Sequence, residues 1–170
     1  MNQNSKIRNI VFTAVFASVI YISTALLFHI PTGINNGYIH LGDAFIYLAA
    51  VLLPMPYGLF AAAIGAGLAD VLTGSVIWLI PTLLIKPTMA LLFTNKNDNI
   101  VCKRNIASVF GAGIITIVGY YIAEVILFGN FVAPMAGVIP NSVQALGSGC
   151  VFLVIGYAFD KINIKKRVSI

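Results

Sequence analysis

Residues 106–128 read IASVFGAGIITIVGYYIAEVILF, and Glu124 is the one charged residue in this stretch. A transmembrane helix needs about 20 mostly apolar residues, so the stretch is long enough to cross a membrane. Other apolar segments lie on both sides of it along the chain. The six segments are at residues 10–28, 43–53, 57–73, 77–93, 106–128 and 138–159.

The composition agrees with a lipid environment. Of the 170 residues, 59% are hydrophobic and 9% are charged, whereas soluble domains contain about 25% charged residues. A transmembrane β-barrel would need segments that alternate apolar and polar residues, and these segments do not alternate. The sequence therefore predicts an all-α integral membrane protein, a six-transmembrane-helix bundle that forms a single domain over residues 1–170, with no room for a soluble catalytic domain.

The basic residues predict the orientation of the bundle. Apart from Lys86, every Lys and Arg precedes the first segment, lies between the fourth and fifth, or follows the sixth. With six spans these positions share one side, which the positive-inside rule makes cytoplasmic. We therefore expect a multi-pass protein of a bacterial cell membrane, with both termini in the cytoplasm. The formal net charge of +5 reflects this topology, so no nucleic-acid partner is expected.

Four ionisable side chains interrupt the apolar segments or their ends. On insertion scales such a residue costs about 2.5–3.5 kcal/mol at the membrane centre, so it is a functional hypothesis by default. By the predicted topology most of them lie in the outer half of the bundle. They are Asp43, Asp70, Lys86 and Glu124.

Aromatic and amide side chains share helix faces with these residues. Trp78 and Lys86 lie on one stripe, Tyr120 and Glu124 on another, because residues three and four apart share a face. Aromatic walls with a few placed polar groups suit a small planar ligand. The predicted binding residues are Asp43, Asp70, Trp78, Lys86, Tyr120, Glu124, Asn141 and Gln144.

Structural roles are an alternative for each of these residues. Asp70 and Lys86 could form an ion pair that only neutralises charge, and Trp78 could belong to an interfacial aromatic belt. Asn141 and Gln144 could serve as hydrogen-bonding glue between helices. His40, next to the second segment, is interpreted as an interfacial residue.

Small residues near the cytoplasmic end of the first segment allow close helix contact. They serve either internal packing or the docking of another membrane protein. The candidate docking residues are Ala14, Ala17 and Ser18.

No motif in the sequence indicates an enzyme. The chain has no P-loop and no zinc-protease or serine-hydrolase motif. His29 and His40 are the only histidines and are not placed as a metal pair, so no metal site or cofactor is expected.

Several motifs, taken in order, resemble a known family. YIHLGD at residues 38–43, LPMPYG at 53–58, GLAD at 67–70, TLLIKP at 82–87 and IPNSVQ at 139–144 are similar to substrate-binding S components of energy-coupling factor (ECF) vitamin transporters. The resemblance covers nearly the whole chain. It is strongest to the branch that includes the pyridoxine, hydroxymethylpyrimidine and riboflavin S components.

This resemblance implies a substrate-binding subunit that has no ATPase of its own. Such a subunit captures a vitamin outside, under the loop at residues 31–41, and works with a transmembrane coupling subunit and two ATPase subunits. It also implies that residues 14–18 form the docking surface, with Ser18 in place of a second alanine.

The acidic and aromatic residues favour pyridoxine or a thiamine-precursor pyrimidine, and riboflavin is also compatible. Two alternatives are a stand-alone proton-coupled transporter or channel that uses Asp70, Lys86 and Glu124 as a relay, and a structural membrane protein without a ligand.

Overall fold

Helices form at all six predicted apolar segments in the computed structural model, which describes residues 3–27, 29–31 and 38–168. A two-stranded antiparallel hairpin and a short C-terminal helix are additions that the apolar pattern does not predict. In chain order the elements are α1 (Gln3–Ile22), the π-helical turn η1 (Ser23–Leu27), β1 (Ile30–Pro31), β2 (Tyr38–Ile39), α2 (Gly42–Leu52), α3 (Tyr57–Leu72), the 3-10 turn η2 (Val76–Trp78), α4 (Leu79–Leu91), α5 (Lys103–Phe128), α6 (Met135–Lys161) and α7 (Ile164–Val168).

The predicted helix starts differ most from the structure at α1, and by three residues at both α5 and α6. Helix α1 begins at Gln3 rather than at residue 10, because charged residues such as Lys6 and Arg8 extend a helix well although they are not apolar. Helix α6 begins at Met135 rather than at residue 138, and Pro140 lies inside the helix. Residue 28, the predicted end of the first segment, lies outside the described residues.

The helices fall into a long set and a short set. By length and composition, three stretches of the described residues are long enough to cross a membrane, namely Gln3–Leu27, Lys103–Phe128 and Met135–Lys161. Helix α2, with 11 residues, rises only about 16 Å, roughly half of a 30 Å hydrocarbon core. A helix this short leaves space beyond its N-terminal end.

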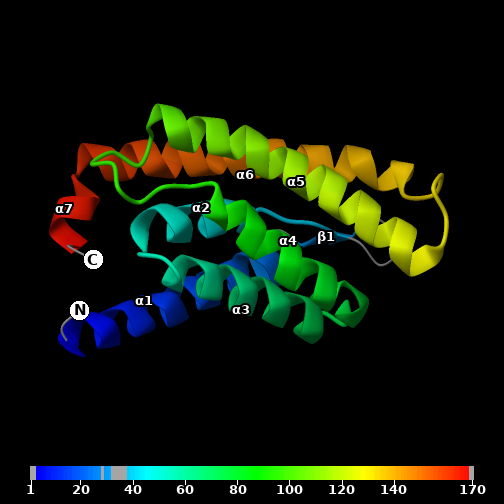
Figure 1. Cartoon of the computed structure of the whole chain (residues 1–170), viewed down its shortest axis with the longest axis horizontal. Coiled ribbons are helices and arrows are strands. Elements are labelled where there is room, and N and C mark those ends of the chain that lie inside the picture. The colour runs from blue at the N-terminus through cyan, green and yellow to red at the C-terminus, as the bar shows by residue number, and fades with distance from the viewer. Residues whose placement is uncertain (1–2, 28, 32–37, 169–170) are drawn as a thin grey trace.

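Helix α2 is the centre of the bundle. It lies between the α5–α6 pair and the group formed by α1, α3 and α4 (Figure 1). Its side chain Tyr47 is fully buried and stacks on Phe93, with ring centroids 4.7 Å apart, while Phe152 meets both rings edge-on. The aromatic cluster attaches α2 to the C-terminal end of α4 and to α6.

Small residues on α3 serve internal packing. The buried face of α3 includes Ala62, Gly65 and Ala66, and α1 packs closely against it. Ala17, one of the predicted docking residues, is buried at this contact and is only 5% exposed. Ala14 and Ser18 are exposed. The expectation that all three form one outward surface is therefore wrong for Ala17, which lies on the neighbouring face of the helix.

Both termini lie at one end of the bundle, together with the connector between α4 and α5 (Figure 1). The connector is held by side chains from the adjoining helices. The Asp160 carboxylate accepts hydrogen bonds from the backbone N–H groups of Ile100 and Val101, at 2.7 and 2.9 Å. Asn105 is fully buried and bonds to both the N–H and the carbonyl of Thr94. This hydrophilic segment is thus a well-bonded part of the fold.

Candidate functional site

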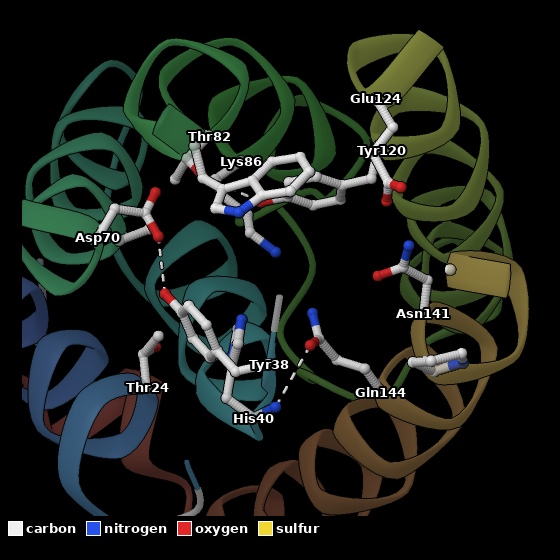
Figure 2. Close-up of a pocket in the computed structure, with 14 residues that line it drawn as sticks. Thr24, Tyr38, His40, Asp70, Thr82, Lys86, Tyr120, Glu124, Asn141 and Gln144 are labelled. Atoms are coloured by element: carbon white, nitrogen blue, oxygen red, sulfur yellow. Dashed lines mark hydrogen bonds between the residues drawn. The ribbon is translucent and has the colours of Figure 1, made fainter. Parts of the chain in front are cut away.

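A cavity opens at the N-terminal end of α2, surrounded by α3, α4, α5 and α6 and bordered by the hairpin (Figure 2). Its empty space, including the open solvent at its mouth, amounts to about 640 Å³. The polar and aromatic lining residues are Thr24, Tyr38, His40, Asp70, Trp78, Thr82, Lys86, Tyr120, Glu124, Asn141 and Gln144.

A buried ion pair forms the floor of this cavity. Lys86 donates to Asp43 Oδ1 at 2.7 Å, and the two side chains are 2% and 0% exposed. Gln144 Nε2 donates to the other oxygen of Asp43 at 2.9 Å, and its own Oε1 accepts from the backbone N–H of His40. Two buried charges need this kind of pairing to offset the loss of hydration.

This floor identifies the ionic partner of Lys86. The sequence left open an ion pair between Asp70 and Lys86, whereas the structure pairs Lys86 with Asp43 from α2. Asp43 itself lies just behind the cavity surface, since it contacts the lining residues without being one of them. All other predicted binding residues line the cavity.

The hairpin brings two side chains that the sequence analysis did not select as binding residues. Tyr38 donates its hydroxyl to Asp70 Oδ1 at 2.7 Å, and its ring stacks on His29 with a centroid separation of 4.1 Å. Burial, followed by the charge of Asp70, raises the pKa of Tyr38, so the phenol remains a donor. The hairpin is thereby attached to α3.

His40 is buried at the cavity rather than placed at the membrane interface as expected. It is 6% exposed, and the backbone N–H of Gly42 donates to its Nδ1 at 3.1 Å. Burial lowers the pKa of His40 to about 4, so the imidazole is neutral at pH 7. Because Nδ1 accepts, the proton lies on Nε2. Tyr38 and His40 belong to the YIHLGD motif, so the sequence did mark this segment. The pattern of apolar residues predicts helices only, and therefore could not predict that these two side chains line the cavity.

Aromatic side chains form the wall on the side of α4 and α5. The rings of Trp78 and Tyr120 meet at 67° with centroids 5.9 Å apart. The Tyr120 hydroxyl is 3.0 Å from Thr82 Oγ1, and Lys86 Nζ lies 5.2 Å from the centre of the Tyr120 ring. Contacts from η2 and α4 therefore fix the orientation of Tyr120.

The wall formed by α5 and α6 is polar. Glu124 is 6% exposed and lines the cavity beside Asn141. Gly137 is close to its carboxylate, since a Cβ atom there would lie 2.8 Å from Glu124 Oε1. Figure 2 shows Asn141 and Gln144 projecting from α6 toward the space between the walls. Carboxylates, amides and an aromatic pair thus surround one space, while no group of three His, Cys, Asp or Glu suited to a metal occurs in the described part of the chain.

Comparison with known proteins identifies the family. The family model named ECF-type riboflavin transporter, S component, matches residues 4–165. The chain belongs to this family. The resemblance seen in the motifs is confirmed, and this S component is the substrate-binding subunit of a vitamin transporter rather than an enzyme, with apolar helices compatible with a membrane location.

A relative of this S component occurs in Pyrococcus woesei. It is 32% identical over 148 residues, which cover 86% of this chain and 95% of that protein. The relative is described as an uncharacterized protein in gap 3′region.

Proposed function

We propose that this S component binds one small heteroaromatic vitamin or precursor in the cavity above α2 and delivers it across the membrane. Pyridoxine and the hydroxymethylpyrimidine precursor of thiamine are the favoured ligands, and riboflavin, which the family name mentions, is the next candidate. The observation that carries this proposal is the convergence of the Trp78–Tyr120 pair with Asp70 and Glu124 on one cavity.

The cavity chemistry supports a flat ring with hydrogen-bond donors. A ring packed against Tyr120 and Trp78 gains aromatic contact, which contributes about 0.5–1.5 kcal/mol beyond its buried area. The carboxylates of Asp70 and Glu124 accept from hydroxymethyl, amino or ring N–H groups, and hydrogen bonds to charged acceptors are worth about 1.5–3 kcal/mol. Asn141 can both donate and accept at the remaining edge.

Trp78 gives a direct test, because it is the only tryptophan in the chain and lines the cavity. Titrating the purified protein with pyridoxine, the pyrimidine or riboflavin is expected to change its fluorescence with saturation for at least one of them. Tyr120→Ala is expected to weaken that binding by about 2- to 10-fold.

Calorimetry supplies the control for this test. Trp78→Phe removes the fluorescence signal but keeps an aromatic ring, so binding should still be measurable as heat. Phe110→Ala, an exposed position on the outer surface of α5, should leave the affinity unchanged. The proposed ligand class is wrong if none of the three compounds binds by either method.

The energy for uptake is proposed to come from partners. The family implies ECF module components, which we take to be a transmembrane coupling subunit and two ATPase subunits. The exposed residues Ala14 and Ser18 on α1 are the proposed contact with the coupling subunit. A stand-alone relay through Asp70, Lys86 and Glu124 is not favoured by the family, and the floor geometry binds Lys86 to Asp43 instead.

The proposed membrane topology has six spans, with both termini in the cytoplasm. The clustering of both ends and the α4–α5 connector at one end of the bundle supports it (Figure 1), because that end carries the Lys and Arg residues outside the apolar segments. The cavity then faces the outside, as capture of an external vitamin requires.

Cysteine labelling tests this orientation. In a variant in which Cys102 and Cys150 are replaced by serine, Ala133→Cys and Asn99→Cys place a thiol at opposite exposed ends of the bundle. An impermeant maleimide is expected to label position 133 on intact cells and position 99 only after permeabilisation. The reverse pattern would contradict the topology.

A further inference from the structure

The cavity and its floor contain more negative than positive formal charge. Three carboxylates, of Asp43, Asp70 and Glu124, accompany one ammonium group, that of Lys86. The Lys86 charge is already balanced by Asp43 at 2.7 Å. His40 adds no positive charge at pH 7, because its pKa is about 4. Among the described residues, the formal charges of the cavity and its floor therefore sum to a negative value.

Asp70 has one carboxylate oxygen that accepts no hydrogen bond from the described residues. Its side chain is 3% exposed, and Oδ1 accepts from Tyr38. Its other oxygen, Oδ2, is buried without a hydrogen-bond partner among the described residues, as is Oγ1 of Thr24 in the same lining. Figure 2 shows the Asp70 carboxylate directed from α3 toward the cavity. A buried acceptor left without a donor is unfavourable, so native structures rarely contain one without a reason.

We infer that Asp70 determines the charge selectivity of the site: its Oδ2 accepts a hydrogen bond from an N–H or O–H group of the vitamin and its charge excludes phosphorylated or carboxylated compounds. This inference rests on the proposed function, the binding of a vitamin in this cavity. A donor from the ligand would satisfy this oxygen, which has no hydrogen-bond partner among the described residues. The substrate class is thereby narrowed to neutral or cationic ring compounds.

A phosphorylated vitamin fails at this site for two reasons. A phosphate monoester carries about −1.5 to −2 charge at pH 7 and presents acceptor oxygens, so it offers no donor to Oδ2. Its charge is repelled by Asp70 in a poorly hydrated space, where interactions between charges are several times stronger than in water. Lys86, the one Lys or Arg among the described lining residues, is paired with Asp43.

Matched ligand pairs test the selectivity. Riboflavin is compared with riboflavin 5′-phosphate, and pyridoxine with pyridoxine 5′-phosphate, by Trp78 fluorescence and calorimetry. For the pair whose unphosphorylated member binds, the phosphate is expected to weaken binding by about a hundredfold or more. Asp70→Asn keeps the shape of the side chain and removes its charge, so this ratio should fall at least about tenfold.

Two further variants distinguish the charge of Asp70 from the shape of its side chain and from the net charge of the protein. Asp70→Glu keeps the charge, so the ratio should remain high even where the affinity itself falls. Asp98→Asn removes the same charge from an exposed position on the α4–α5 connector, and should change neither affinity nor ratio. If Asp70→Asn does not fold, Asp70→Ser and the wild-type ratio still test the inference.

These experiments can disprove charge selectivity by Asp70 without disproving the binding of a vitamin. Equal binding of phosphorylated and unphosphorylated members would overturn the charge selectivity and leave the vitamin-binding function standing. An unchanged ratio in Asp70→Asn would overturn the role of Asp70. Binding of neither member of either pair would count against the proposed ligand class, and the inference would fall with it.

Discussion

Replacing Lys86 with methionine is expected to lower the free energy of unfolding by about 3–5 kcal/mol, because it leaves Asp43 as an unpaired buried charge. Asp43 is 0% exposed and has two hydrogen-bonding side-chain partners, Lys86 and Gln144. Only the weaker amide contact would remain. For a chain of this size the loss corresponds to a melting temperature lower by about 6–20 °C.

Thermal unfolding of the detergent-purified protein measures the effect. The double variant Asp43→Asn with Lys86→Met removes both charges, so it should recover most of the stability that the single variant loses. Lys96→Met, at an exposed position on the connector, is the matched control and should shift the melting temperature by less than about 2 °C. A double variant no more stable than Lys86→Met would show that the pairing of charges is not the reason for the loss.

The positions of the helices could be predicted from the sequence because lipid imposes a simple requirement. A segment in the hydrocarbon core must satisfy its backbone hydrogen bonds internally, so an apolar run becomes a helix. Residues 43–53 and 57–73 are therefore close to the helices at Gly42–Leu52 and Tyr57–Leu72. The start of α1 was missed because this helix extends beyond the apolar residues, as at Lys6.

The sequence predicted which residues line the cavity better than it predicted which residues contact one another. Helical spacing and topology brought Trp78, Tyr120 and Glu124 to the same depth, and the structure places all three around the cavity. Spacing along one helix does not say which neighbouring helix a side chain meets. The partner of Lys86 and the burial of Ala17 therefore depended on tertiary packing that the sequence pattern does not contain.

The close contact between α1 and α3 depends on the absence of a side chain at Gly65. A Cβ atom there would lie 2.6 Å from the carbonyl oxygen of Ala17 and 2.8 Å from Ile20 Cβ, so the backbone of α1 would have to move. At Gly67, two residues along the same helix, a Cβ atom would lie 3.2 Å from the terminal methyl groups of Leu79 and Leu83. Those side-chain ends can shift by small rotations.

The same substitution should therefore have opposite effects at the two positions. In both, alanine improves helix propensity over glycine by about 1 kcal/mol. Gly67→Ala should leave the melting temperature unchanged or slightly raised, whereas Gly65→Ala should lower stability by up to about 3 kcal/mol through overpacking. Because α1 leads into Thr24 and α3 carries Asp70, separating these helices should also weaken vitamin binding in Gly65→Ala alone. Thermal unfolding and Trp78 titration measure both effects, and similar shifts in the two variants would contradict a backbone-limited contact at Gly65.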